Sequence, residues 1–203
     1  GPDRRLERSP PVPEEGEQSP HSGYPVPMRV LVTGGAGFIG SHFVRRLAES
    51  GTEVAVLDKL TYAGNPANLH GIEHEFFQGD IADPDAVDRA AAGCAAIVNF
   101  AAETHVDRSI LGPQEFVHTD VLGTMCLLEW ARAHDARYVQ VSTDEVYGDL
   151  EAGGRALEDD PLRPSSPYSA AKAGGDLQVL AYVRTYGVRA SITRGANTYG
   201  PNQ

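Results

Sequence analysis

The sequence has few of the residues that could form a disulfide framework, a metal cluster or a membrane span. Its 203 residues include two cysteines, Cys94 and Cys126, which show neither CxxC nor metal-ligand spacing. We therefore expect no disulfide framework and no metal site, and we interpret both thiols as buried apolar groups. No apolar stretch reaches the roughly 20 residues that a membrane span needs, and the N-terminus lacks a signal-peptide core. These absences predict a soluble, cytoplasmic protein without a membrane partner.

Positive charge is also in short supply. With 17 Lys and Arg against 28 Asp and Glu, the formal net charge is −11. Proteins that bind nucleic acid or anionic membranes normally carry a basic face, so neither partner is expected. Small phosphorylated ligands stay open, because helix N-termini and backbone amides bind phosphate without net positive charge.

The first 27 residues contain almost nothing to bury. Residues 1–27 are dominated by Pro, Glu, Ser and Arg, a composition typical of disorder. The opening Gly-Pro also matches what a tag-cleaving protease leaves behind. We interpret residues 1–27 as a disordered tail or a tag remnant and assign residues 28–203 to one domain.

From Met28 onward, strand-like and helix-like patterns alternate. β-branched apolar runs predict strands at 28–34, 53–58, 73–80, 95–102, 136–143 and 189–200. Helical spacing predicts helices at 41–51, 83–93, 112–135 and 166–187. Asp83 would cap the second helix ahead of Pro84, and Gly123 would allow close packing of the third. This order predicts an α/β fold, a Rossmann-like doubly wound parallel sheet.

Five polar or glycine-rich segments follow the predicted strands. They are "TGGAGFIG", "LDKLTYAGN", "QGDIAD", "NFAAETHVDRS" and "STDEVYG". Doubly wound sheets bind ligands at the carboxyl ends of their strands. We therefore expect these segments to converge on one edge and form the functional site.

The first of these segments predicts a dinucleotide site. It satisfies both G-x-G-x-x-G and T-G-x-x-G-x-x-G through Gly34, Gly37 and Gly40. Asp58 lies 18 residues beyond Gly40, where an acid accepts hydrogen bonds from the adenosine ribose and repels a 2′-phosphate. This favours NAD over NADP; the alternative for Asp58 is a solvated loop acid.

Two further strand ends fit the same cofactor. Asp80, in "GDI" with Ile81, could meet the adenine amino group or instead cap the helix that follows, where Asp83 is the better cap. Ala101 and Ala102 have the small side chains that a backbone beside a dinucleotide requires. Their alternative is simple close packing.

Catalytic chemistry is indicated by "YSAAK". Tyr168 and Lys172 are four residues apart and share one face of a predicted helix. We expect the ammonium to lower the pKa of the phenol and so make it a base near neutral pH; the same lysine can bond the nicotinamide ribose. Thr143 could bind the same substrate oxygen. A phenolate that takes a hydroxyl proton while the carbon's hydride goes to NAD predicts an oxidation.

Asp144 and Glu145 stand side by side after a strand that reads as buried. Burying an unpaired carboxylate is costly, so the pair is either solvated and inert or directed at a substrate. Repulsion between close carboxylates raises one pKa, which allows one acid and one base at neighbouring positions.

Seven motifs in chain order resemble those of one enzyme family. They are "TGGAGFIGSHFVRRL", "DKLTYAGNPANL", "GDIAD", "AAETHVDRSI", "STDEVYGD", "PSSPYSAAKAGGD" and "NTYGPNQ". Over residues 28–203 the sequence resembles the extended short-chain dehydrogenase/reductases, and within them the dTDP-glucose 4,6-dehydratases. "STDEVYG" and "LTYAGN" are much more specific than the glycine motif or YxxxK, which belong to the whole superfamily.

This resemblance implies a lyase reaction in three stages that converts dTDP-glucose to dTDP-4-keto-6-deoxyglucose. Tyr168, held by Lys172, would take the proton of the 4′-hydroxyl as the C4′ hydride passes to NAD. Glu145 would remove the C5′ proton and Asp144 would protonate the departing 6′-hydroxyl, after which the hydride returns to C6′. Thr143 would hold the 4′-oxygen.

The resemblance assigns further residues to cofactor and substrate. The amides of Phe38 and Ile39 would bind the pyrophosphate. Side chains are expected from several loops: Lys59 and Thr61 beside the adenosine, Thr104 near nicotinamide and substrate, Thr119 near the cofactor, and Asn197 at the sugar nucleotide. His105 is interpreted as a structural hydrogen-bonding residue.

Three departures from the family pattern stand out. Asp120 occupies a position where the superfamily commonly has an asparagine that supports the lysine, which puts the proton relay in question. Thr198 replaces the usual asparagine after Asn197, so a nicotinamide contact is expected to be lost. The chain stops at Gln203, and we expect the smaller C-terminal substrate domain to be mostly missing.

Two other functions remain open. A sugar-nucleotide 4-epimerase shares the fold, NAD, Tyr168 and Lys172 but needs no acid pair. A non-catalytic NAD-binding regulator would keep only the glycines and Asp58. The resemblance also implies a homodimer formed by helices at 113–134 and 168–186, while the nucleobase and the sugar are not readable from these residues.

Overall fold

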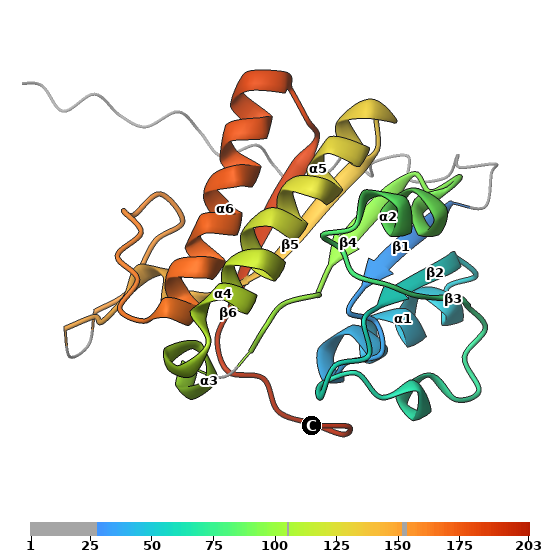
Figure 1. Ribbon diagram of the computed structural model, residues 1–203, viewed down its shortest axis with the longest axis horizontal. Helices are drawn as coiled ribbons and strands as arrows, with labels where there is room; N and C mark the ends of the chain where they lie inside the picture. The colour runs from blue at the N-terminus through green and yellow to red at the C-terminus, as the bar shows by residue number, and fades with distance from the viewer. Residues whose placement is uncertain (1–27, 105, 152–153) are drawn as a thin grey trace, which may run out of the picture.

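A single parallel sheet organises the chain. The computed structural model describes residues 28–104, 106–151 and 154–203, so the expectations for residues 1–27 and His105 lie outside the described part. Six strands run in the order β3-β2-β1-β4-β5-β6 (Figure 1), and each neighbouring pair is parallel. The strands are β1 (Arg29–Thr33), β2 (Glu53–Asp58), β3 (Glu75–Gln78), β4 (Ala96–Asn99), β5 (Arg137–Thr143) and β6 (Ala190–Gly195). The doubly wound sheet is confirmed.

Helices connect the strands and cover both faces. They are α1 (Phe38–Glu49), α2 (Pro84–Ala91), α3 (Val106–Leu111), α4 (Pro113–Phe116), α5 (Thr124–Ala133) and α6 (Pro167–Tyr186). The single helix expected at 112–135 is wrong in detail, because a π-helical segment, Val117–Gly123, separates α4 from α5. Such segments often mark functional sites. Two 3₁₀ turns, Pro66–Leu69 and Asp144–Tyr147, complete the elements.

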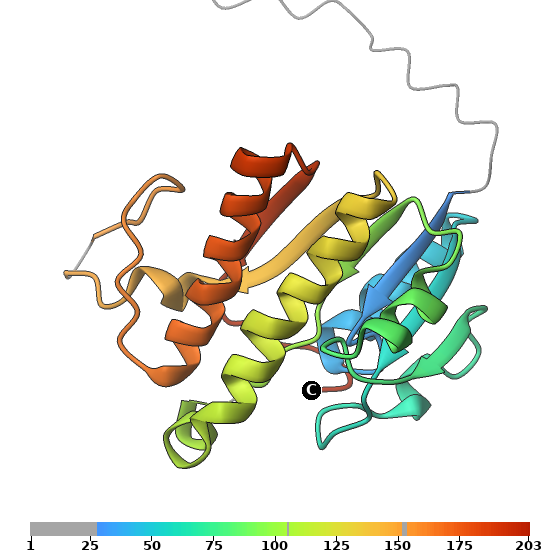
Figure 2. The same ribbon diagram turned by 45° about the horizontal axis from the view of Figure 1, so that its top comes forward.

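Side chains of the central strands alternate between two apolar layers. Val30 and Val32 of β1 pack with α1, while Leu31 points to the layer that α2, α5 and α6 share (Figure 2). All three are nearly inaccessible to solvent. A sheet covered on both faces therefore leaves its strand ends as the place for polar groups.

Two packing details bear out the sequence. Asp83 caps α2 by accepting a hydrogen bond from the amide of Asp85, with Pro84 in the first turn. Gly123 has no room for a side chain, since an added Cβ would lie 2.6 Å from Cδ1 of Ile81.

Cys94 is buried and Cys126 half-buried, both as free thiols.

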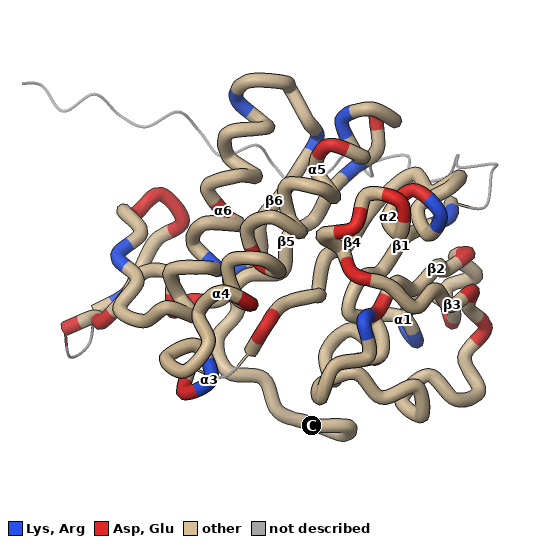
Figure 3. The backbone as a smooth tube through the Cα atoms, viewed as in Figure 1, with Lys and Arg blue, Asp and Glu red and all other residues tan. Residues whose placement is uncertain are grey.

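The chain after β6 turns back across the carboxyl edge of the sheet. Figure 1 shows it ending beside α1, where the carbonyl of Pro201 lies 2.9 Å from Nε2 of His42. Lys and Arg are dispersed over several elements of the described chain (Figure 3). No helix among the described residues is long and apolar enough to cross a membrane.

We expect Gly123→Ala to destabilise the complete protein. The added methyl would lie 2.6 Å from the side chain of Ile81, and overpacking of this kind costs about 1–3 kcal/mol. Urea denaturation measures the change in the free energy of unfolding. Gly195→Ala is the matched control, because a Cβ added at Gly195 would meet nothing within 4 Å. A Gly123→Ala protein as stable as this control would contradict the packing.

Candidate active site

The loops after β1 and β4 meet backbone to backbone. Gly34 adopts φ +65°, and a Cβ there would lie 2.6 Å from the amide nitrogen of Ala101. A Cβ on Gly40 would lie 2.3 Å from the carbonyl oxygen of Gly34. Glycine is therefore required at both positions, and the two loops meet through their main chains. β4 ends at Asn99, so Ala101 and Ala102 follow the strand rather than end it as expected.

Helix α1 begins directly after the glycine-rich loop that follows β1. It starts at Phe38, three residues before the expected Ser41, because Gly37 is extended and already accepts the amide of Ser41. The amides of Phe38 and Ile39 thus belong to the first turn, whose N–H groups have no partner inside the helix. Together with the positive end of the helix dipole they suit a pyrophosphate.

Asp58 is locked in place rather than solvated. Its Oδ2 accepts the amide of Ala36 at 2.9 Å, and its Oδ1 accepts the amide of Leu60 at 2.8 Å. The solvated-loop alternative is therefore wrong. Each carboxylate oxygen keeps a lone pair, so the side chain can still accept ribose hydroxyls. Thr61 lies half-buried in the next turn.

Asp80 forms an ion pair with Lys59, which is also expected beside the adenosine. Nζ of Lys59 lies 2.8 Å from its Oδ2, and the amide of Ala82 donates to its Oδ1. Burial raises the pKa of Asp80, but these two bonds outweigh burial and the net pKa is lowered. Since Asp83 is the cap of α2, the capping alternative for Asp80 is wrong. Ile81 is buried in the core beneath the π-helical segment.

Thr104 and Thr119, both expected near the cofactor, differ in their contacts. Thr104 is held by Tyr62, whose hydroxyl donates to the Thr104 carbonyl at 2.9 Å; the guanidinium of Arg108 stacks 3.7 Å from the centre of the Tyr62 ring. Thr119, on the π-helical segment, is buried, and its hydroxyl has no hydrogen-bond partner among the described residues. A buried hydroxyl without a partner fits a residue that faces a ligand.

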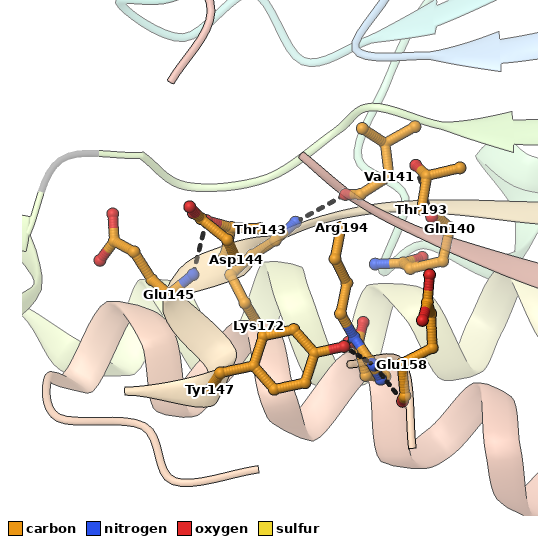
Figure 4. Close-up of polar contacts among 11 residues, drawn as sticks. Gln140, Val141, Thr143, Asp144, Glu145, Tyr147, Glu158, Lys172, Thr193 and Arg194 are labelled. Carbon is orange, nitrogen blue, oxygen red and sulfur yellow. Dashed lines mark hydrogen bonds and ion pairs between the residues drawn. The ribbon is translucent and has the colours of Figure 1, made fainter. Parts of the chain in front are cut away.

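The acid pair opens the 3₁₀ turn at the end of β5. Oγ1 of Thr143 caps this turn by accepting the amide of Glu145 at 3.2 Å. The side chains of Asp144 and Glu145 are exposed, and Figure 4 shows both carboxylates directed away from the helices below the strand. They line a cavity of about 680 Å³ that also reaches Tyr147 and Arg194.

Lys172 reaches the same strand end from α6. Its side chain is 4 % exposed, and Nζ donates to the carbonyl of Val141 at 3.0 Å. The other neighbour of the ammonium is Asp120 of the π-helical segment, with Oδ1 at 3.5 Å. Burial raises the pKa of Asp120 to about 6, against the opposing pull of the lysine charge.

Tyr168 behaves differently from expectation. Burial, followed by the negative charges of Glu145, Asp120 and Asp144, raises its pKa to about 12, although a hydrogen bond with Thr143 lowers it. The expectation that Lys172 brings the phenol near neutral is therefore wrong for the protein without ligands. The reason is geometric, because the ammonium is turned to Val141 and Asp120 and its charge is countered there.

Four supporting residues were not assigned to the site by the sequence analysis. Phe116 of α4 packs edge-on against the Tyr168 ring, at a centroid distance of 6.3 Å and an angle of 87°. Arg194 of β6 donates from Nη1 to the hydroxyl of Tyr147 at 2.7 Å and from Nε to Asp176 of α6 at 2.8 Å (Figure 4). We call these contacts of Arg194 with Tyr147 and Asp176 the clamp. Its one sequence signal was a lone arginine near the end of the β6 strand pattern.

The remaining expected residues follow β6. Asn197 and Thr198 are exposed on the returning segment, and the hydroxyl of Thr198 donates to the carbonyl of Ala196 at 3.4 Å. Among residues 28–104, 106–151 and 154–203, no three His, Cys, Asp or Glu side chains gather to hold a metal.

Comparisons with known proteins agree with this geometry. The profile of the NAD dependent epimerase/dehydratase family matches residues 30–203. A dTDP-glucose 4,6-dehydratase of Streptomyces niveus is 54% identical over 187 residues, which cover 87% of this chain and 55% of that protein. The chain thus spans about half the length of the curated relatives it matches.

Solved structures show the same likeness. DesIV, the dTDP-glucose 4,6-dehydratase of Streptomyces venezuelae crystallised with NAD and dTDP, superposes with a TM-score of 0.83 at 53% identity and covers 87% of this chain and 58% of its own. A UDP-glucose 4-epimerase of Thermus thermophilus with NAD reaches a TM-score of 0.80 at 40% identity, with 87% and 57% covered.

We expect Arg194→Met to destabilise the complete protein strongly. It would leave the carboxylate of Asp176, which is fully buried, without its cation, a loss that costs about 3–5 kcal/mol. Urea denaturation of the single variant and of the double variant Arg194→Met/Asp176→Asn measures this. The double variant, which removes the stranded charge, should recover part of the loss. Equal stability of the single variant and the unmodified protein would contradict the clamp.

Proposed function

Because the chain belongs to the NAD dependent epimerase/dehydratase family, we propose that the complete protein is a dTDP-glucose 4,6-dehydratase. This hydro-lyase converts dTDP-glucose to dTDP-4-keto-6-deoxyglucose with no net redox change. One observation carries the proposal beyond the family: two neighbouring carboxylates, Asp144 and Glu145, line a cavity, and the charges of both act on the phenol of Tyr168. Oxidation alone needs a tyrosine and a lysine, whereas elimination of water also needs an acid and a base.

We expect the loops after β1 and β4 to bind NAD. Glycine is required where these loops meet, the amides of Phe38 and Ile39 would receive the pyrophosphate, and Asp58 would accept the ribose hydroxyls. Lys59 and Asp80 would border the adenosine, and Thr119 would lie near the cofactor. NAD, when bound, would supply the acceptor for the C4′ hydride and later the donor of that hydride to C6′, with a proton returning to C5′ in the same reduction.

The 4′-hydroxyl would lie between Thr143 and Tyr168. The Thr143 hydroxyl, which hydrogen-bonds the phenol, would also hold the 4′-oxygen. With a pKa of about 12, the phenol is protonated in neutral water, so the surrounding charges decide when it can act as a base. Lys172, four residues further along α6, is the cation that would favour the phenolate.

We assign the elimination of water to Asp144 and Glu145. Glu145 would remove the C5′ proton, which the 4′-ketone acidifies, and Asp144 would protonate the leaving 6′-hydroxyl. Thr143 fixes the amide of Glu145, and the clamp of Arg194 on Tyr147 holds the far end of the same 3₁₀ turn. The two carboxylates thus stand on a short, doubly anchored turn, as precise proton transfer requires.

The partners of the complete protein are also part of the proposal. We propose a homodimer through α4, the π-helical segment, α5 and α6, whose surface exposes Leu122, Leu177, Leu180 and Val183. A mainly apolar cavity of about 660 Å³ lies on this face, between Gln178 and the π-helical segment. A cytoplasmic location, the absence of nucleic-acid and membrane partners, and a substrate role for Thr104 and Asn197 stay predictions.

The acid pair separates the competing functions. A 4-epimerase, such as the similar Thermus thermophilus enzyme, needs Tyr168 and Lys172 but no base at C5′. A non-catalytic NAD-binding regulator needs neither. An elimination product therefore favours the dehydratase over both.

We expect Glu145→Gln in the complete protein to retain NAD binding and to lose exchange of the C5′ proton with deuterated solvent. The amide cannot accept this proton, so turnover of dTDP-glucose should fall by about 100-fold or more, the usual size of a general-base contribution. NMR of the sugar follows the exchange, and calorimetric titration follows NAD binding.

Glu151→Gln is the matched control, because it neutralises an exposed acid on the same loop outside the cavity. It should exchange and turn over as the unmodified protein does. Undiminished turnover of Glu145→Gln would contradict the assigned base.

A further inference from the structure

Behind the reacting tyrosine lies a buried ion pair. The side chains of Asp120 and Lys172 are 1 % and 4 % exposed, and Nζ of the lysine lies 3.5 Å from Oδ1 of the aspartate. Neither carboxylate oxygen of Asp120 makes a hydrogen bond of good geometry to a described residue. The pair is therefore mainly electrostatic, and the charge of one partner governs the other.

The π-helical segment and α6 hold this pair together. A Cβ on Gly175 would lie 2.7 Å from the carbonyl oxygen of Asp120, so the two helical backbones touch at this point. On the other side, the carbonyl of Val141 in β5 accepts a hydrogen bond from the ammonium. Lys172 thus has fixed neighbours on two other elements and little freedom to turn toward the phenol.

Few other charges reach Asp120. From the loop after β4, the carboxylate charge of Glu103 raises the pKa of Asp120, while the Glu103 backbone lowers it. From β5 and α6, the phenols of Tyr138 and Tyr168 face it, and the negative charge of Asp120 raises the pKa of each. Lys172 is the cation that acts most strongly on Asp120.

We propose that Asp120 is a positioning residue that sets how much of the Lys172 charge reaches Tyr168. Ionised, it holds the ammonium against Val141, cancels its charge and keeps the phenol protonated. Protonated, it frees that charge to favour the phenolate. This inference rests on the proposed function only for its effect on turnover; the electrostatic coupling itself concerns the protein alone.

The sign of the coupling follows from the pKa values. The pKa of Asp120, raised to about 6, makes it ionised above pH 6, so at neutral pH it opposes deprotonation of Tyr168. Removing its charge while keeping its shape should lower the pKa of the phenol from about 12. The rising limb of a pH–rate profile that depends on the phenolate should then move to lower pH.

The test is Asp120→Asn in the complete protein. Ultraviolet absorbance reports the phenolate, and subtracting the same protein with Tyr168→Phe isolates the residue. We expect its titration to move to lower pH by about one unit or more, the size of the effect of one nearby charge. Asp176→Asn is the control, because it neutralises an equally buried acid of α6 that does not act on Tyr168.

The outcomes distinguish this inference from the proposed function. An unshifted titration in Asp120→Asn, or an equal shift in Asp176→Asn, would overturn the coupling. The pH profile of dTDP-glucose turnover provides the second readout; if no product forms in any variant, the proposed function fails while the titration still decides the coupling. If Asp120→Asn does not fold, Asp120→Ser, which leaves room for water, is titrated in its place with the same expectation.

Discussion

The cost of burying polar groups governs this structure. A parallel sheet with helices on both faces leaves its central strands no contact with water, so a polar side chain there must find a partner. Asn99 of β4 shows the consequence: it bonds Thr33 of β1 and donates to Gln140 of β5 at 3.0 Å. These three residues form a polar ladder across neighbouring strands in an otherwise apolar sheet, and the chemistry is left to the carboxyl edge.

At that edge, backbone contacts build one half of the proposed site and charged side chains build the other. Backbone dominates the cofactor half, where Gly34 and Gly40 bring main chain against main chain. Side-chain charge dominates the substrate half, where Lys172 is paired with Asp120 and the acids of the 3₁₀ turn act on Tyr168. The resting charge balance therefore favours a protonated phenol, and ligand binding or protonation must change it before the tyrosine can act as a base.

Local signals accounted for most of the fold. Strand runs, caps such as Asp83 and the glycine spacing each act over a few residues, and they predicted each strand and its order along the chain, although β4 and β6 end earlier than expected. The π-helical segment was not predicted, because its register depends on packing against Ile81 and α6. Likewise the raised pKa of Tyr168 could not be foreseen, since it arises mainly from burial of the phenol and from the charges of Glu145, Asp120 and Asp144 in the folded chain. The clamp of Arg194 joins residues from three elements, and a lone arginine at the end of the β6 pattern was its only local signal.

Oxidation, elimination and reduction are proposed to happen at one strand edge on one bound sugar. The most direct measurement places deuterium at C4′ of dTDP-glucose and follows it through the complete protein by NMR and mass spectrometry. We predict a dehydrated 4-keto product that carries the deuterium at C6′. Deuterium retained at C4′ in an undehydrated 4-epimer would contradict the proposal and identify an epimerase.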